Sequence, residues 1–342
     1  MKVTNSEEQL VSVIMPTYNH AKFIGKAIES VLNQTCKNFE LIIIDNYSED
    51  DTEKIVISYE DDRIIYLKFR NNGIIAASRN HGIKHSHGEY IAFLDSDDFW
   101  LPSKLEKQLP HFGTPEIVGV ASDAVLFSET PYYRKSNLAK SKQGYADYKY
   151  IDILNRNRIM TSSLIVRRDI LNQSGLFNED KTFSFIEDWE LWLRMARYGS
   201  FRILESHFLF YFVSRKRGYQ SSEISKNCLK ILKKQVDLDY VKCDDIIESK
   251  AAVYLAIARN SLEFDQPQSR KYYMQALRTT FDIPRKIKGC VGLLISFFPS
   301  PLRKTVLLIL YKADWFLHNL NDWLRKITKI FYWVHHCNKN NA

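Results

Sequence analysis

The first hundred residues repeat one pattern: a short apolar run of strand character, a polar turn, and a segment whose apolar residues recur every three or four positions. The strand-like runs cover residues 11–15, 39–44, 63–69 and 90–94. The spacing between them predicts amphipathic helices. Strands that alternate with helices form a mostly parallel sheet covered on both faces, because parallel strands need a crossover connection. We therefore expect an α/β fold whose polar turns gather at one edge of the sheet.

An acidic turn, Asp95-Ser96-Asp97-Asp98, ends the fourth run. Ligands of open α/β sheets bind beyond the carboxyl ends of the strands, so we expect these side chains to face a ligand. Three carboxylates within four residues repel one another unless a cation lies between them. Oxygen ligands of this kind suit Mg²⁺ or Mn²⁺. The alternative is a plain acidic turn, since Asp and Ser both favour turns.

Polar residues also follow the first two runs, as Pro16-Thr17-Tyr18-Asn19 and as Asp45-Asn46. Further along, Glu187-Asp188 begins a segment that has the pattern of a helix to residue 196, with Gly199 as its stop. Carboxylates in the first turn of a helix have a structural explanation, because they interact favourably with the helix dipole. Only the context of other motifs can decide whether these two also have a catalytic role.

The overall composition limits the class of protein. Hydrophobic residues make up 45% of the chain and charged residues 26%, which are globular values and exclude global disorder. The five cysteines are widely spaced and form no Cys-x-x-Cys motif, which argues against a disulfide framework or a zinc site and fits a reducing compartment. No early apolar run is long enough for the core of a signal peptide. We therefore expect the chain to start in the cytoplasm.

The net charge of +8 is unevenly placed. Residues 283–342 hold ten Lys and Arg residues against two Asp residues, so the rest of the chain is neutral by this count. A localised basic tail is therefore a better description than a nucleic-acid-binding protein.

The tail also has an amphipathic pattern. Strand signals end near residue 220, and helical patterns continue from there. In the tail, apolar residues step by three or four positions and form one stripe opposite charged side chains. The members of the stripe are Phe316, Leu320, Trp323, Ile327, Phe331 and Val334. Aromatic residues together with Lys and Arg on such a helix are typical of a segment that lies in a membrane interface. The alternative is a helical bundle that packs on the catalytic domain or on a second subunit.

Five motifs, taken together, resemble those of the inverting family 2 glycosyltransferases of the GT-A fold. They are residues 11–19, 39–50, 77–82, 88–98 and 187–194. The resemblance covers about residues 10–220 and implies a Rossmann-like GT-A catalytic domain with a mixed, mainly parallel sheet. Residues 10–98 would form its nucleotide-binding half and residues 99–220 its acceptor half. A helical extension (221–282) and the basic tail (283–342) would form an α-helical C-terminal region.

The resemblance implies a role for each motif. Asp97 matches the principal ligand of Mg²⁺ or Mn²⁺, and Asp95 matches its partner carboxylate near the donor. Asp188 matches the general base, which removes the acceptor hydroxyl proton while that oxygen attacks the anomeric carbon. Glu187 would orient the acceptor or its neighbours. The matches to the nucleotide-sugar site are Pro16, Thr17, Tyr18, Asn19, Asp45, Asn46, Arg79, Asp95 and Ser96.

Two positions depart from the family pattern. Asn46 stands where many members have a second Asp that contacts the nucleobase. An amide can still bind a pyrimidine, but this residue supports uridine over thymidine or another base less strongly than an Asp would. Ser214 stands where members often have a His that helps bind metal or diphosphate, and His207 or the basic residues 215–217 are candidates to replace it. Without its motif, Arg79 would also fit the surface of a helix.

The expected activity is that of a metal-dependent hexosyltransferase. It would move a sugar from a nucleotide-diphosphate sugar, expected to be UDP-linked, to a hydroxyl group of a glycan or a lipid-linked glycan precursor. Together with the tail, this implies a peripheral position on the inner face of the cell membrane. One alternative is a membrane-bound assembly factor without activity, which the departure at Ser214 allows. Another is a nucleotidyltransferase, but its first loop would be rich in glycine, and residues 16–19 contain none.

Overall fold

The computed structural model describes residues 9–129, 133–136, 141, 143–155, 157–213, 221–237, 246–261 and 266–279, together with residues 293 and 296. The chain divides into two compact units, Met1–Ser249 and Lys250–Ala342. Ser214, residues 215–217 and the amphipathic stripe of the tail lie outside the described residues.

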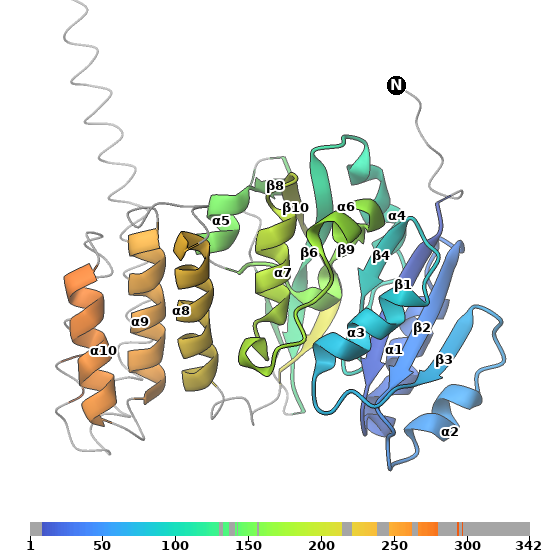
Figure 1. Ribbon diagram of the computed structural model, residues 1–342. Helices are drawn as coiled ribbons and strands as arrows, with labels where there is room; N and C mark the ends of the chain where they lie inside the picture. The colour runs from blue at the N-terminus through green and yellow to red at the C-terminus, as the bar shows by residue number, and fades with distance from the viewer. Residues whose placement is uncertain are drawn as a thin grey trace, which may run out of the picture. The chain divides into compact units, whose positions relative to one another are not determined.

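The first unit contains the described strands and most of the described helices (Figure 1). The strands are β1 (Val11–Thr17), β2 (Phe39–Asp45), β3 (Ile64–Lys68), β4 (Tyr90–Phe93), β5 (Phe99–Trp100), β6 (Ile117–Phe127), β7 (Tyr133–Lys135), β8 (Tyr145–Tyr148), β9 (Ile165–Arg167) and β10 (Ser200–Phe212). The helices are α1 (Ala21–Leu32), α2 (Thr52–Ile57), α3 (Ile75–Lys84), α4 (Lys104–Gln108), α5 (Tyr150–Asn155), α6 (Arg168–Ser174), α7 (Glu187–Met195) and α8 (Ser221–Asp237). Short 3-10 turns are η1 (Leu109–Phe112), η2 (Thr161–Ser163) and η3 (Lys181–Phe183).

Two further helices follow these elements. Helix α9 (Ile247–Ser261) begins at the end of the first unit, and α10 (Gln266–Thr279) belongs to the second. Both agree with the expectation of helices beyond residue 220.

The described strands form one mixed, mainly parallel sheet, as predicted. Its main path has the order β3-β2-β1-β4-β9-β6-β10-β5, with β7 paired to β6 and β8 to β10. The four strands β3, β2, β1 and β4 are parallel to one another, and β6 is parallel to β10. Strand β9 lies antiparallel between β4 and β6, and β5 is antiparallel to β10. The sheet therefore joins the predicted nucleotide-binding half to the acceptor half through β9.

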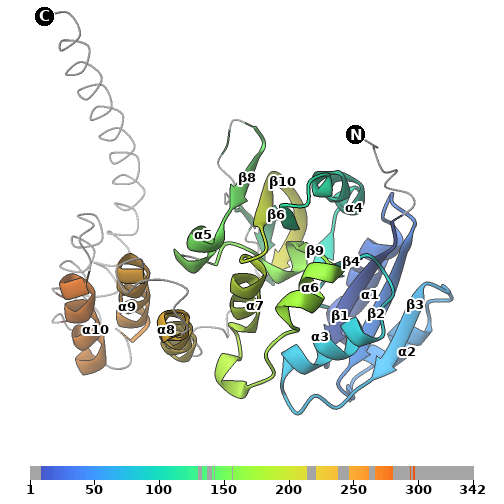
Figure 2. The same cartoon turned by 45° about the horizontal axis from the view of Figure 1, so that its top comes forward.

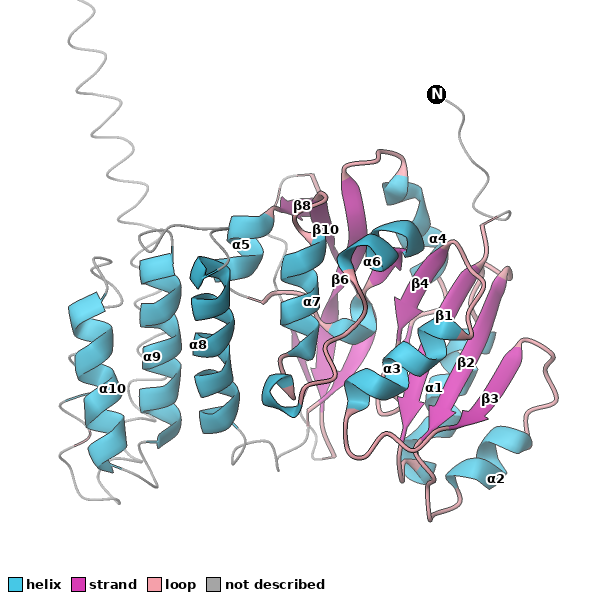
Figure 3. Ribbon diagram, in the orientation of Figure 1, coloured by secondary structure: helices cyan, strands magenta, loops and turns pink. Residues whose placement is uncertain are grey.

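Both faces of β1, β2 and β4 are buried, which is why their sequences are continuous apolar runs rather than alternating ones, whereas β3 at the end of the sheet is only partly buried. Val13 and Met15 belong to the core that includes the buried residues of α1. Ile14 and Ile44 point to the other face, where they approach Gly82 of α3. Figure 3 shows α3, α6 and α7 on one face of the sheet and α1 on the other. Helices on both faces hold the strand ends of one edge in fixed positions.

Two expectations about the acceptor half were incomplete. The sequence between residues 128 and 150 predicts an irregular acceptor-side loop, but it contains β7, which pairs with β6, and β8, which pairs with β10. Figure 2 shows β8 beside β10. Strand β10 was not predicted, although it is thirteen residues long. Its pairing with β6 shifts register at three places, so its side chains do not alternate regularly between the faces. Irregular alternation removes the signal from which a strand is predicted.

Candidate functional site

The predicted site residues gather where β1, β2 and β4 end. These strands are parallel neighbours, and the register places Thr17 opposite Asp45 and Ile14 opposite Phe93. The loop after β1, the loop after β2 and the acidic turn after β4 therefore lie at the same edge of the sheet. The expected gathering of polar turns is confirmed.

The loops after β1 and β2 are tied to each other. The backbone N–H of Asn19 donates to Ser48 Oγ (2.9 Å), and Asn19 Oδ1 accepts from the backbone N–H of Glu49 (2.8 Å). Asn19 has a φ of 52°, and Tyr47 has a φ of 57°, a left-handed conformation that non-glycine residues adopt rarely. The hydrogen bonds hold both loops in these conformations before any ligand binds. Asn19 therefore shapes the loop that follows the buried Pro16 at the end of β1.

Asp45 is enclosed by the protein itself. It is fully buried; its Oδ1 accepts from the N–H (3.0 Å) and hydroxyl (2.6 Å) of Ser48, and its Oδ2 accepts from the hydroxyl of Tyr66 (2.6 Å). Asp45 thus stabilises the loop after β2 through its bonds to Ser48. The neighbouring Asn46 is only partly buried, and its Oδ1 accepts from the backbone N–H of Asn71 (2.9 Å).

Two other residues of the first loop differ in exposure. Thr17 is buried, and its hydroxyl group has no hydrogen-bond partner among the described residues. Tyr18 is 48% exposed. A buried hydroxyl without a partner and an exposed aromatic ring at the same strand end are groups that a ligand could use.

The acidic turn after β4 is anchored at two of its four positions. Ser96 is buried, and its hydroxyl lies 2.7 Å from His20 Nδ1. Asp98 is buried, and its Oδ1 accepts from the backbone N–H of Phe212 (2.7 Å), whereas its Oδ2 has no partner among the described residues. Burial, together with the negative charges of Asp97 and Asp95, raises the pKa of Asp98 well above its ordinary value. Ser96 and Asp98 therefore fix the turn, and Asp95 and Asp97 are its partly exposed carboxylates.

The donor groups of the turn fit a hard divalent cation. Asp95 and Asp97 offer carboxylate oxygens, and a cation between such closely spaced carboxylates would relieve their mutual repulsion. Within the described part of the chain, no three His, Cys, Asp or Glu side chains could hold a metal by themselves. Mg²⁺ is commonly held by one or two carboxylates together with substrate phosphates, so a complete protein cage is not needed.

His207, one of the two candidates to replace the histidine that other family members have at the position of Ser214, makes a hydrogen bond within the protein. Nε2 of His207 lies 3.0 Å from the backbone carbonyl oxygen of Ser136, which gives this ring a structural contact.

Arg79 is buried rather than exposed at the surface of α3. It is 3% exposed, and it donates through Nη2 to Asp95 Oδ1 and through Nη1 to Glu187 Oε1, both at 2.8 Å. Burial lowers the pKa of Arg79, but the charges of Asp95 and Glu187 outweigh it, and the net shift is upward. This guanidinium therefore stays charged and links the acidic turn to the first turn of α7.

Asp188 stands at the start of α7, next to Glu187. Its Oδ2 accepts from the hydroxyl of Thr161 (3.0 Å) and, more weakly, from Nδ2 of Asn157 (3.4 Å). Burial, and then the charge of Glu187, raise the pKa of Asp188 to about 6, against the opposing charge of Arg79. A carboxylate with this pKa is mostly ionised at neutral pH, yet it accepts a proton more readily than an ordinary Asp.

Asp95 and Asp188 line the same cavity, which has a volume of about 270 Å³. The other lining residues are Asn157, Arg158, Ile159, Met160, Thr161 and Tyr211. None of these was predicted from the sequence, because residues 157–161 carry no motif and no periodicity. The adjoining β9 brings the segment to the site by its pairing with β4 and β6.

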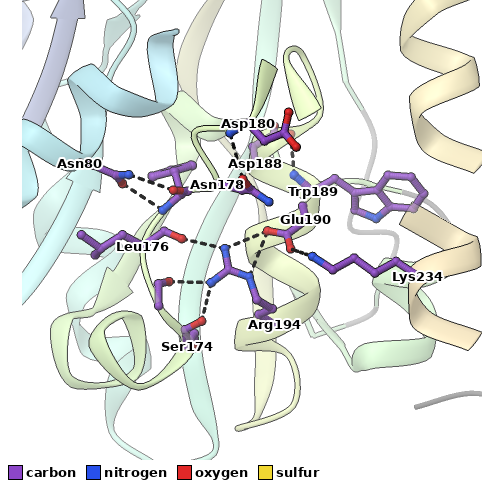
Figure 4. Close-up of polar contacts among 12 residues, drawn as sticks. Asn80, Ser174, Leu176, Asn178, Asp180, Asp188, Trp189, Glu190, Arg194 and Lys234 are labelled. Atoms are coloured by element: carbon purple, nitrogen blue, oxygen red, sulfur yellow. Dashed lines mark hydrogen bonds and ion pairs between the residues drawn. The ribbon is translucent and has the colours of Figure 1, made fainter. Parts of the chain in front are cut away.

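Polar contacts from two helices hold the segment that leads to α7 (Figure 4). Arg194, on α7, pairs with Glu190 and donates to the carbonyl oxygen of Leu176 (2.7 Å). From α3, Asn80 Nδ2 donates to the carbonyl oxygen of Phe177 (2.8 Å), and Asn80 Oδ1 accepts from the N–H of the same residue (2.9 Å). These contacts fix the chain before it enters the helix that carries Asp188.

A mixed sheet with loops and carboxylates at the carboxyl ends of its parallel strands, extended by a second half, defines the class of proteins with the GT-A fold. The mannosyltransferase PcManGT from Pyrobaculum calidifontis, whose structure was solved in complex with GDP-Man and Mn²⁺, shares this fold. It matches with a TM-score of 0.57 and 16% sequence identity, over 88% of this chain and 84% of that one.

Sequence comparisons give the family. The sequence model described as "Glycosyl transferase family 2" matches residues 12–175. An Escherichia coli protein, UDP-Glc:alpha-D-GlcNAc-diphosphoundecaprenol beta-1,3-glucosyltransferase WfgD, is 30% identical over 273 residues, which are 78% of this chain and all of that protein. An uncharacterized glycosyltransferase of Rickettsia typhi is 32% identical over 201 residues, 57% of this chain but only 61% of that relative's length. The chain belongs to glycosyltransferase family 2, and it is an enzyme of that class.

Proposed function

We propose that the protein is a metal-dependent, inverting glycosyltransferase that moves a sugar from a UDP-sugar to a hydroxyl group of a lipid-linked glycan precursor. The family supports the transfer of a sugar. The name of the E. coli relative supports the donor and acceptor classes, since it includes UDP-Glc and a diphosphoundecaprenol-linked sugar.

One observation carries the proposal: a single cavity is lined by Asp95, from the acidic turn, and by Asp188, the carboxylate of raised pKa. A donor whose diphosphate lies at the acidic turn would present its anomeric carbon to this cavity. Asp188 would take the proton from the acceptor hydroxyl as that oxygen attacks the carbon from the side opposite the diphosphate. A single displacement of this kind inverts the configuration at the anomeric carbon.

Asp97 and Asp95 would hold Mg²⁺ or Mn²⁺ in this enzyme. When bound, the metal would stabilise the negative charge that develops on the departing diphosphate. Asp98 and Ser96 keep the turn in place through their bonds to Phe212 and His20.

The loops after β1 and β2 would bind the nucleotide. Thr17 has a buried hydroxyl without a partner, Tyr18 has an exposed ring, and Asn46 has an amide beside them, so these three are the proposed contacts. Asp45 and Asn19 would act through the loops they hold, because their described bonds are to protein groups. Pro16, the next-to-last residue of β1, would support this site from within the strand.

We further propose that the protein works at the inner face of the membrane, held by the basic tail of residues 283–342. A lipid-linked acceptor would keep the reaction at that surface. No helix among the described residues is long and apolar enough to cross a membrane. Deleting the residues beyond 282 is expected to move the protein from the membrane pellet to the supernatant. Sedimentation of the truncated protein with membranes would support the alternative, a bundle that packs on protein.

The activity is tested with a panel of UDP-sugars and a GlcNAc-diphosphate-lipid acceptor, with product configuration determined by NMR. The wild type should release UDP and form a product of inverted anomeric configuration. Asp97→Ala should lose metal-dependent turnover, whereas Asp169→Asn, at an exposed position on α6, should keep it. A wild type that turns over no nucleotide sugar would instead favour the alternative of a non-catalytic assembly factor.

A further inference from the structure

Arg79 is shared between two carboxylates that come from opposite halves of the catalytic domain. Asp95 follows β4 in the nucleotide-binding half, and Glu187 begins α7 in the acceptor half. We infer that Arg79 is a positioning residue that ties the acidic turn to the first turn of α7, and so sets where Asp188 stands relative to the donor, without touching the nucleotide itself. This inference rests on the proposed function, because it assigns Asp188 the role of base.

The surroundings of Arg79 argue against direct contact with the nucleotide. Both terminal nitrogens are engaged at 2.8 Å, and the side chain is 4% exposed. The ring of Phe177 lies 5.4 Å from the guanidinium carbon and covers one side of the group. Nε is the nitrogen without a partner among the described residues, and it is buried. A buried guanidinium that already pairs with two carboxylates of the protein is poorly placed to bind a diphosphate as well.

The next residue of α3 reinforces the same connection. Asn80 exchanges two hydrogen bonds with the backbone of Phe177, ten residues before Glu187. Arg79 and Asn80 therefore hold both ends of the segment that delivers the base. Helix α3 itself lies close to the sheet, because a Cβ atom at Gly82 would come within 2.9 Å of Ile14 Cγ2. Helix α3 is thus fixed to the nucleotide-binding half, and through Arg79 and Asn80 it also fixes the start of α7 in the acceptor half.

Glu187 is the second carboxylate that Arg79 contacts, and only one of its two carboxylate oxygens has a hydrogen-bond partner among the described residues. Its Oε1 accepts from Arg79, and its buried Oε2 has no partner among the described residues. Removing one partner of a buried ion pair is strongly destabilising, because the other charge is left without compensation. Removing Arg79 would therefore leave an uncompensated charge directly beside Asp188.

The charges around Asp188 predict in which direction its pKa shifts when Arg79 or Glu187 is replaced. Glu187 raises the pKa of Asp188, and Arg79 lowers it. The other titratable or charged groups that face it are Cys228 of α8 and, around the cavity, Asp95, Arg158 and Tyr211. Replacing Arg79 or Glu187 by a neutral side chain of similar size should thus shift the ionisation of the base in opposite directions.

The test compares Arg79→Met, Glu187→Gln and the double variant with the wild type. For each protein, kcat is measured against pH at saturating donor and acceptor, and UDP binding is measured by calorimetry with Mn²⁺. Arg79→Met should lower kcat at least tenfold and move the acid limb to higher pH, and UDP affinity should stay within about fivefold. Glu187→Gln should move the limb to lower pH, and the double variant should recover part of the turnover lost in Arg79→Met.

A matched control is Arg168→Met, which removes a partly buried guanidinium from the opposite end of β4, where it bonds to Ser86 and Gly88. It should leave the pH midpoint unchanged even if it lowers thermal stability. More than tenfold weaker UDP binding by Arg79→Met, with an unmoved midpoint, would assign Arg79 to the nucleotide and overturn the inference. If Arg79→Met does not fold, an unmoved midpoint in Glu187→Gln overturns it equally.

Failure of the proposed function would look different, since the wild type itself would then show no turnover. In that case the UDP affinities of the variants, and a double-mutant cycle of thermal unfolding for Arg79 and Glu187, still decide the inference. Strong coupling with unchanged UDP affinity supports it, and additive effects with lost UDP binding overturn it.

Discussion

Replacing Asp188 by Asn tests the proposed base, because it removes the carboxylate and keeps its shape. A positioned general base typically contributes a factor of about 10²–10⁴ to the rate, so kcat should fall by about that factor. The pKa of about 6 also predicts how the wild-type rate depends on pH, because only the ionised form of Asp188 can accept a proton. About a tenth of the enzyme is in this form at pH 5 and about nine tenths at pH 7. Wild-type kcat/KM, which reports the free enzyme, should therefore rise about tenfold over this range and level off above it.

The assay follows UDP release between pH 5 and 8 at donor and acceptor concentrations well below saturation, so that the rate reports kcat/KM. The residual rate of Asp188→Asn should lack the rise near pH 6. An Asn variant that keeps more than a tenth of the activity, or a wild-type profile that is flat between pH 5 and 7, would refute the assignment of Asp188 as base.

Unfolding experiments control for damage to the fold. The pKa of Asp188 is higher in the folded protein than its ordinary value of 3.8, so the folded state binds more protons than the unfolded state between pH 3.8 and about 6. The free energy of unfolding contributed by this group therefore falls as pH rises through that window. Asn has no such dependence, so the variant should be as stable as the wild type at pH 8, or more stable by about 1–3 kcal/mol.

Three further predictions follow from the same site. Thr161→Ala removes a hydroxyl that lowers the pKa of Asp188 by hydrogen bonding, so the acid limb of the pH profile should move up by about 0.5–1 unit; an unmoved limb would mean that this bond is absent in the working enzyme. Gly82→Ala places a Cβ atom 2.9 Å from Ile14 Cγ2 and should cost about 1–3 kcal/mol in urea unfolding, whereas no loss would show that α3 can move away from the sheet. Removing divalent metal with EDTA should abolish sugar transfer and Mn²⁺ should restore it; full activity in EDTA would exclude the proposed role of Asp97.

Much of the fold could be predicted from the sequence because its signals are local. The runs at residues 11–15 and 39–44 became β1 and β2 because strands buried on both faces consist almost entirely of apolar residues. The polar turns that follow them, and the acidic turn after β4, lie at one edge because parallel strands end together. The motif at Glu187-Asp188 likewise begins a helix, as its pattern predicts.

Only the tertiary structure decided which groups meet. The bond between Arg79 and Glu187 joins residues 108 positions apart, and no local pattern in the sequence contains that pairing. The pKa of Asp188 depends on burial and on neighbours from other elements, and Asn157 and Thr161 come to it through a segment without a motif. Asp45 shows the same limit, since its sequence position suggests a ligand contact and its bonds to Ser48 and Tyr66 enclose it. Periodicity and turn chemistry act between near neighbours in the chain, whereas burial and charge pairing depend on distances in space.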